Sequence, residues 1–400
     1  MNPHLLFGPD EGWSLAPVAL WLLGDAQKLR DPVALIGALA GQLDAAGARI
    51  GRLAFISRTL HPQFAGWSVR WSRTDGARHD SFPHSSAATP TFTDSPVFYV
   101  QQHRTAFRQR VARQAESGEY SLFTELRAAG LSDYLALPVH YGTTLVSIFT
   151  AASDAAEGFS EADIERLTVL ARLLAPLIEI IGTRATALGL LNTFVGPRIG
   201  ERILHGQVKR GDGDRIDAAF WYSDLRGFTH LSETLDTVEL LSLLNDYFEH
   251  CAAAATTRGG EILQFIGDAI LIVFEIKSPS QRADVCNGAL TAAVSAFSAI
   301  ADINAQRRAA GRAVIEFGLG LHVGTVTHAN VGSPDRLAFN VVGPAVNMTA
   351  RIQSKTKELN SPLLVSSDFA RELATSLRSL GHHDLRGVAG EQELFTSLPA

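Results

Sequence analysis

Residues 262–274 read ILQFIGDAILIVF, two apolar runs separated by the dipeptide Gly267-Asp268. A two-residue Gly-Asp connection between such runs is typical of a tight β-hairpin. We therefore expect strands over residues 261–266 and 269–274, with Asp268 at the tip of the hairpin. Aspartate is also an ordinary turn residue, so this position alone assigns it no chemical role.

A second aspartate, Asp224, ends an apolar strand pattern over residues 216–225. Arg226 and Gly227 follow soon after it. A carboxylate placed where a strand meets a glycine-containing turn can project towards a ligand while the backbone turns away. The ordinary alternative is an aspartate that caps the helix that follows.

Two more strands and a helix complete the pattern. Residues 315–323 and 338–342 have strand patterns, and residues 346–353 have a helical one. On that helix Asn347 and Arg351 are four residues apart, so they share one face. Taken alone, such a pair is common on exposed helices and indicates no function.

Taken in this order, the three segments resemble the catalytic domain of class III adenylate and guanylate cyclases. The resemblance is carried by FWYSDLRGFT at 220–229, ILQFIGDAILIVF at 262–274 and VVGPAVNMTARI at 341–352. It extends from Ile216 to the C-terminus, nearly half of the chain. It implies an α+β protein whose C-terminal domain, residues 213–400, has the ferredoxin-like, palm-type fold of these cyclases.

The resemblance assigns the chemistry to two groups of residues. Asp224, Asp268 and the backbone carbonyl of Leu225 match the ligands of two divalent cations, Mg²⁺ or Mn²⁺, which prefer oxygen donors. Asn347 matches the residue that orients the ribose, and Arg351 the residue that stabilises charge on the α-phosphoryl group. In this family the two groups come from opposite subunits, so the resemblance implies a homodimer.

The residues expected to read the purine depart from the family pattern. Gln264 stands where adenylate cyclases have lysine, and Asn340 where they have aspartate or threonine. Because each amide offers both a donor and an acceptor, the pair suits adenine and guanine alike. We expect ATP as the main substrate, with appreciable use of GTP. Further substrate contacts are expected from one aromatic and two basic residues, the arginines being equally well explained as solvated side chains: Phe228, Arg336 and Arg386.

Two other interpretations stay open. An inactive cyclase fold could bind a nucleotide without turnover, and the departures at Gln264 and Asn340 favour this, whereas the presence of all four catalytic and metal-binding motif residues disfavours it. A palm-fold polymerase or diguanylate cyclase is suggested only by RGGEI at 258–262, which precedes a strand rather than lying at a turn between two strands.

The N-terminal half has the pattern of a separate α/β domain. Strand patterns at 135–140 and 144–150 are followed by GFSEADIERL at 158–167, which begins a long helix that Ser160 can cap. These segments resemble a GAF-type sensor domain over residues 20–183. Such a domain either binds a small regulatory molecule or serves a purely structural role, and the sequence favours neither.

Two further segments are expected: a linker that follows this domain and a stretch of loops within it. Residues 184–212 have the pattern of a helical linker to the cyclase-like domain. Residues 74–95 are rich in Ser, Thr, Pro, Gly and Asp and are expected to form loops.

Composition limits the partners and the location. The net charge of −6, with no dense Lys/Arg cluster, disfavours nucleic acids and anionic membranes as partners. The chain has two cysteines, Cys251 and Cys286, which indicates a reducing compartment. Its apolar runs lack the length or flanking charges of a membrane span or a signal peptide. We therefore expect a cytoplasmic protein.

Overall fold

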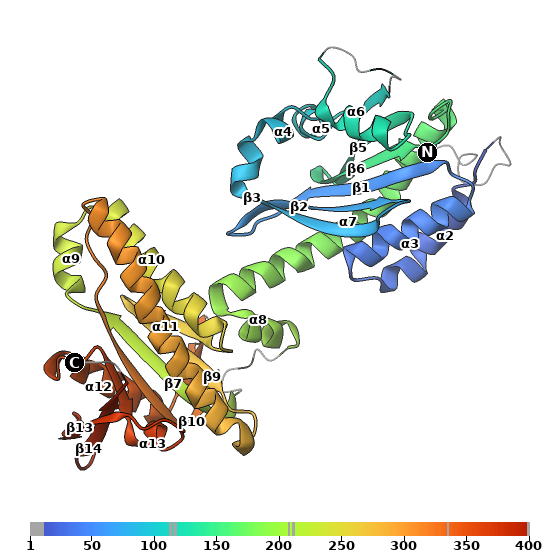
Figure 1. Ribbon diagram of the computed structural model, residues 1–400. Helices are drawn as coiled ribbons and strands as arrows, with labels where there is room; N and C mark the ends of the chain where they lie inside the picture. Colours follow the sequence, from blue (N-terminus) through green and yellow to red (C-terminus); the bar gives the residue numbers. More distant parts are fainter. Residues whose placement is uncertain are drawn as a thin grey trace. The chain divides into compact units, whose positions relative to one another are not determined.

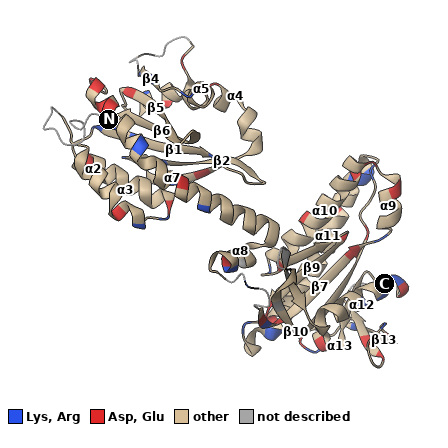
Figure 2. Ribbon diagram, turned by 180° about the vertical axis from the view of Figure 1, so that it is seen from behind, with Lys and Arg blue, Asp and Glu red and all other residues tan. Residues whose placement is uncertain are grey.

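The chain folds into two compact units, residues 1–193 and 194–400 (Figure 1). The computed structural model describes residues 12–397 except 112–113, 115–117, 207–208, 210–212 and 334–335. Charged residues occur as short, scattered segments in both units (Figure 2).

The first unit is built on a six-stranded antiparallel sheet with the order β3-β2-β1-β6-β5-β4. Its strands are β1 (Ile50–Arg58), β2 (Phe64–Ser72), β3 (Gly76–Pro83), β4 (Phe107–Arg110), β5 (Asp133–Tyr141) and β6 (Thr144–Ser153). Figure 1 shows helices on both faces of this sheet. On one face the core is shared with α2 (Ala16–Leu23), α3 (Pro32–Ala45) and α7 (Glu161–Val195). On the other it is shared with α5 (Pro96–His103) and α6 (Ser121–Ala128).

The expectation of loops over residues 74–95 is wrong. This segment contains strand β3 and two short helical turns, η2 (His84–Ala88) and α4 (Pro90–Thr93). Strand β3 lies at the edge of the sheet and pairs only with β2, and most of its residues are exposed or half-buried. Strands are predicted from the alternation of apolar and polar residues, and this alternation arises where one face of a strand is buried. An edge strand that buries little surface does not need it.

Helix α7 begins with the predicted cap. The Ser160 hydroxyl accepts a hydrogen bond from the Asp163 amide at 3.2 Å, and the Asp163 carboxylate accepts one from the Ser160 amide at 2.9 Å. The helix then runs without interruption to Val195, with Pro176 inside it. Its fully buried positions end at Ile181.

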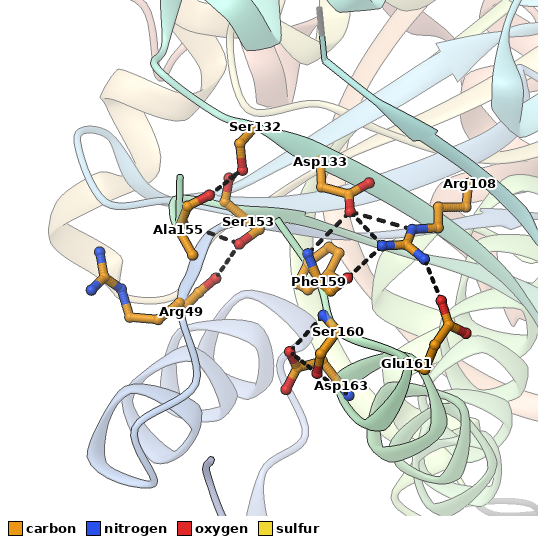
Figure 3. Close-up of polar contacts among 10 residues, drawn as sticks. All are labelled: Arg49, Arg108, Ser132, Asp133, Ser153, Ala155, Phe159, Ser160, Glu161 and Asp163. Atoms are coloured by element: carbon orange, nitrogen blue, oxygen red, sulfur yellow. Dashed lines mark hydrogen bonds and ion pairs between the residues drawn. The ribbon is translucent and has the colours of Figure 1, made fainter. Parts of the chain in front are cut away.

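A buried aspartate fixes the start of α7 to the sheet (Figure 3). Asp133 of β5 is fully buried, and its carboxylate accepts hydrogen bonds from Arg108 of β4 at 2.9 Å and from the Phe159 amide at 3.0 Å. Arg108 also pairs with Glu161 at 2.8 Å. Gly158, at φ 75°, lies so close to Asp133 that a Cβ there would meet the carboxylate at 2.7 Å. The buried charge is therefore compensated by a guanidinium and a backbone donor, as a buried carboxylate requires.

The second unit contains an eight-stranded sheet with the order β13-β14-β12-β10-β7-β9-β8, and β11 pairs with β10 outside this path. Its strands are β7 (Gly213–Leu225), β8 (Glu261–Ile266), β9 (Ala269–Glu275), β10 (Phe317–Ser333), β11 (Arg336–Val342), β12 (Leu363–Ser366), β13 (Arg378–His383) and β14 (Gln392–Thr396). Its helices are α8 (Pro197–Leu204), α9 (Phe228–Thr234), α10 (Thr237–Thr256), α11 (Arg282–Ala309), α12 (Pro344–Glu358) and α13 (Ser367–Ala370), with η3 (Pro279–Gln281) before α11.

Helices cover the two faces of this sheet unequally. Ala219 and Trp221 of β7 pack in the core shared with α10 and α11. Ala218 and Phe220 face the other way, into a cluster with Ala345 of α12. Because side chains alternate along a strand, Asp224 lies on the same face of β7 as Phe220, the face that α12 covers.

Two glycines allow α12 to lie directly on β10. A Cβ at Gly320 would come within 2.7 Å of the Gln353 amide nitrogen and 2.8 Å of the Thr349 carbonyl oxygen. At Gly318 a Cβ would meet the Thr356 side chain at 2.2 Å. At Gly320 the contact is therefore made backbone to backbone, and at Gly318 the strand backbone lies against the Thr356 side chain, so both positions need glycine.

Helix α11 is a long and apolar core helix. Together with η3 it spans Pro279–Ala309, the one helix in the described part of the chain that could cross a membrane by its length and by the mean hydropathy of 1.3 of an 18-residue window. Its small residues, among them Ala289, Ala293 and Ala296, are buried in the core of the second unit.

His322 makes the stability of the second unit dependent on pH. This β10 residue is 7% exposed, its Nδ1 lies 2.8 Å from the Ser366 hydroxyl, and burial lowers its pKa to about 4 against attraction from Asp368, with Arg282 adding to the lowering. The unfolded chain binds the proton near pH 6.5 and the folded chain does not, so stability is lost as pH falls from about 6.5 to about 4.

We predict that the free energy of unfolding of this unit falls by about 2 kcal/mol between pH 7.5 and pH 5 through His322. Hydrogen exchange of the β10 amides, followed against urea at each pH, measures this loss. His322→Gln keeps a polar side chain that cannot be protonated, so the loss should be smaller by about that amount. An equal loss in the variant contradicts the assignment.

Candidate active site

The register of the sheet brings the two predicted aspartates together. Asp224, the penultimate residue of β7, pairs with Ala269, the first residue of β9. Asp268 directly precedes Ala269, in the two-residue turn between β8 and β9, where Ile266 pairs with Ala269. Gly267 in that turn has φ 63°, which glycine adopts without strain. The predicted hairpin is confirmed, and it carries Asp268 to the end of β7.

The proximity of the two carboxyl groups makes it electrostatically unfavourable for both to carry a negative charge. Burial first, and then the hydrogen bond and charge of Asp268, raise the pKa of Asp224 to about 7, while the Leu225 backbone acts in the opposite direction. The Oδ1 atom of Asp224 is buried without a hydrogen-bond partner in the described part of the chain. Two acidic groups packed together with an unsatisfied oxygen make the end of β7 an unfavourable place for two negative charges unless a cation is bound.

This arrangement fits divalent cations. Hard cations such as Mg²⁺ prefer carboxylate and carbonyl oxygens, and a cation would remove the repulsion between Asp224 and Asp268. The Leu225 side chain packs in the core, and its backbone carbonyl, next to Asp224, is an oxygen of the kind that such cations bind. Among the described residues no group of three or more His, Cys, Asp or Glu side chains could hold a metal. The remaining ligands would therefore be water and the phosphates of a substrate.

A buried hydrogen-bond chain supports β7 from the opposite face. The Trp221 indole donates to the Ser223 hydroxyl at 2.8 Å, and the Tyr247 hydroxyl of α10 lies 2.7 Å from the same Ser223 oxygen. All three residues are fully buried. They fix the strand end that presents Asp224.

Sequence reasoning missed two residues of this site. Burial, Asp224 and Asp268 together raise the pKa of Tyr222, which therefore lies near both aspartates. Arg226 donates from Nη2 to the Thr356 carbonyl at 3.2 Å and so ties the end of β7 to the end of α12. The signal for Tyr222 was its position two residues before Asp224 on one face of a strand. Arg226 gave no signal, because its partner is distant in the sequence.

Asn347 and Arg351 do not join the aspartates within one chain. Helix α12 buries Ala345, Thr349 and Ile352, whereas Asn347 and Arg351 are exposed. Within the described residues neither side chain forms a hydrogen bond or ion pair with Asp224 or Asp268. They do share one face of α12, as their spacing predicts, and that face is open.

The two predicted purine-reading residues lie on different strands. Gln264 is exposed on β8, the edge strand of the sheet. Asn340 is half-buried on β11, and its Oδ1 accepts a hydrogen bond from the Val341 amide at 2.8 Å. This bond orients the side-chain amide, whose N–H groups are hydrogen-bond donors.

The three remaining predicted contacts are dispersed. Phe228 begins α9 and packs, half-buried, against the core. Arg386 is exposed between β13 and β14, at the opposite end of the strand order from β8. The side chain of Arg336 lies outside the part of the structure that is described.

Comparison with known proteins finds similarity to nucleotide cyclases over the second unit. Residues 214–396 match the family model described as the adenylate and guanylate cyclase catalytic domain. Over 157 residues the chain is 33% identical to an adenylate cyclase of Anabaena cylindrica, covering 38% of this chain and 30% of that protein. Over 183 residues it is 25% identical to adenylate cyclase 1 of Rhizobium meliloti, covering 45% of this chain and 27% of that protein. The chain thus spans less than a third of the length of these relatives.

Solved structures match the same half of the chain. The guanylyl cyclase Cya2 is 30% identical, with 47% of this chain and 93% of that chain covered and a TM-score of 0.40. The adenylyl cyclase CyaB from P. aeruginosa is 25% identical, with 47% and 97% covered and a TM-score of 0.43.

The pairing of Asp224 with Asp268 predicts that Asp268→Asn stabilises the metal-free protein and abolishes metal binding. Asp268→Asn removes the repulsion with Asp224, so the Tm of the metal-free protein should rise. It also removes a ligand, so titration with Mn²⁺, followed by electron paramagnetic resonance of the free ion, should show binding to the native protein and none to the variant. Asp302→Asn, an exposed carboxylate on α11, is the matched control and should leave both readings unchanged. Equal Mn²⁺ binding by both variants contradicts the metal assignment.

Proposed function

We propose that residues 214–396, which belong to the adenylate and guanylate cyclase catalytic-domain family, convert ATP, and to a lesser extent GTP, into the 3′,5′-cyclic monophosphate and pyrophosphate. The observation that carries this proposal is the contact between Asp224 and Asp268, brought together by strand register from distant parts of the sequence. An inactive relative that only binds nucleotide would have no use for two carboxylates held together at such cost.

The reaction forms one bond and breaks one. The ribose 3′ oxygen attacks the α-phosphorus, the bond to the β-phosphate oxygen breaks, and pyrophosphate leaves. Divalent cations bound at the aspartates supply charge neutralisation and a more acidic 3′ hydroxyl. Asp224 and Asp268 are the residues that would hold these cations. Asn347 positions the ribose, and Arg351 stabilises the negative charge that develops on the α-phosphoryl oxygens.

A homodimer completes the proposed site. Asn347 and Arg351 are exposed on α12, and no contact joins them to the aspartates within the described part of one chain. The edge strand β8 also exposes Phe265 by 53% and Ile266 by 42%, apolar surface that an interface would bury. We infer that Asn347 and Arg351 of the partner subunit face Asp224 and Asp268, so that each site has two halves.

GTP is the second candidate substrate, and a specific observation favours it. The Asn340 oxygen is already bonded to the Val341 amide, so Asn340 offers donors to the base. A donor suits O6 of guanine, whereas adenine carries a donor at N6. Gln264 is exposed and can rotate to meet either base. ATP is retained as the main substrate because the named relatives above include two adenylate cyclases.

We also propose that the first unit is regulatory and that the protein is cytoplasmic. The first unit has a sheet flanked by helices on both faces, which supports assigning it as a GAF-like regulatory domain. Cys251 and Cys286 are buried and unpaired, which supports a reducing, cytoplasmic setting. The scattered charges give no support to a nucleic-acid or membrane partner (Figure 2).

Mixing two inactive variants tests the reaction and the divided site together. Asp268→Ala and Arg351→Ala should each abolish formation of the cyclic nucleotide. In a mixture that exchanges subunits, the heterodimer has one intact site, so activity should return to at most about half of the native rate per dimer. Product chromatography with Mg²⁺ or Mn²⁺ measures it. If subunits exchange and no product forms, the divided site is wrong; if Asp268→Ala is fully active, the metal site is wrong.

Base selection is tested by restoring the pattern of adenylate cyclases. Gln264→Lys combined with Asn340→Asp should raise the ratio of cyclic AMP to cyclic GMP formed, because lysine donates to N1 of adenine and aspartate accepts from N6. We expect about a tenfold or larger change, the effect of one mismatched polar pair. The introduced aspartate can still accept the Val341 amide, so the backbone contact is preserved. An unchanged ratio would place base selection elsewhere.

A further inference from the structure

Three arginines converge on one face of the first unit. Arg52, Arg70 and Arg78 lie on the adjacent strands β1, β2 and β3, and Arg70 pairs directly with Arg78 in the register. Val69 beside Arg70 is fully buried in the main core, so alternation places Arg70 on the opposite face of the sheet. The side chains of Arg52 and Arg70 are only 15% and 25% exposed.

The carboxylates nearby do not satisfy these guanidinium groups. Glu125 of α6 lies 3.4 Å from Arg52 and 3.8 Å from Arg70, and Asp80 lies 3.6 Å from Arg70. Within the described part of the chain none of the three arginines donates a hydrogen bond, and Nε of Arg70 is buried without an acceptor. Burial has the largest effect on Arg70 and lowers its pKa. The charges of Arg52 and Arg78 lower it further, and each acts more strongly than Glu125 or Asp80, which raise it.

A neighbouring arginine shows what full pairing looks like in this unit. Arg73 lies 2.7 Å from Asp44 and 2.9 Å from Asp154, with a hydrogen bond to each. Those contacts raise its pKa, the reverse of the effect at Arg70. The chain can therefore neutralise an arginine closely at this end of the sheet, and at Arg52 and Arg70 it does not.

The unsatisfied donors open into a cavity. Its volume is about 150 Å³, and its charged lining residues are Arg52, Arg70, Arg73, Arg78, Asp75, Glu125 and Asp154. A single water needs only about 15 Å³ of such space. Arginine presents a planar fork of donors that matches the oxygens of phosphate or carboxylate groups.

We propose that this cavity binds a small dianion, either a phosphate-bearing molecule or a dicarboxylate, between Arg52, Arg70 and Arg78. Bound there, its oxygens accept the hydrogen bonds that Glu125 and Asp80 fail to accept, and Glu125 competes with it for Arg52 and Arg70. The site lies within the first unit and does not depend on the proposed cyclase reaction. It gives the first unit a ligand of stated chemistry.

Isothermal titration of the full-length protein tests this site, with inorganic phosphate and succinate as separate probes in low-salt buffer. We expect one of the two to bind, and the stronger one identifies the chemistry. Arg70→Gln should weaken binding by about tenfold or more, the effect of losing charge-assisted hydrogen bonds. Glu125→Gln should tighten binding, because it removes the competing carboxylate. Lys28→Gln is the matched control: Lys28 belongs to the same unit, pairs with Asp25 on the surface and does not line the cavity, so its substitution should leave the affinity unchanged.

Arg78→Gln, at an exposed position on the edge strand, replaces Arg70→Gln if the latter does not fold. Binding that is equal in the native protein, the arginine variants and Glu125→Gln overturns the proposal. Failure of both probes to bind overturns it as well.

Discussion

The repulsion between the Asp224 and Asp268 carboxyl groups is the constraint around which the second unit is built. Two like charges in a half-buried position separate unless the backbone holds them. Here the backbone does so, because Asp224 ends β7 and Asp268 occupies the turn that begins β9, the neighbouring strand. The Trp221–Ser223–Tyr247 hydrogen bonds beneath β7 limit the movement that would relax the pair. A cation bound at the pair, as proposed, would remove this electrostatic cost.

Helix α12 imposes a second constraint, because one of its faces packs on the sheet and the other carries Asn347 and Arg351. Thr349 and Ile352 pack against the sheet, which turns Asn347 and Arg351 outwards. A residue needed at the aspartates of the same chain could not be placed on that outer face. The division of the proposed site between two subunits thus follows from how one helix distributes its side chains.

Local patterns in the sequence were sufficient for the parts of the site that depend on neighbouring residues. Gly267-Asp268 between apolar runs predicts the hairpin, and the spacing of Asn347 and Arg351 predicts their shared face. Contacts between distant segments were not readable. The register that brings Arg70 beside Arg78, the bond between Arg226 and Thr356, and the proximity of Tyr222 to Asp268 all depend on how strands align. The edge strand β3 was missed because it buries too little to show a pattern, and the orientation of Asn340 because its partner is its own backbone neighbour.

The absence of side chains at Gly318 and Gly320 would give these two residues a large influence over the proposed reaction. Because nothing separates α12 from β10 there, a single added methyl group would lift the helix, and Asn347 and Arg351 would move with it. A displacement of about 1 Å at reacting groups can slow an enzyme by a factor on the order of a hundred. The positions of Asn347 and Arg351 in the proposed site therefore depend on the absence of side chains at Gly318 and Gly320. We expect natural variation at these two positions to be limited to glycine.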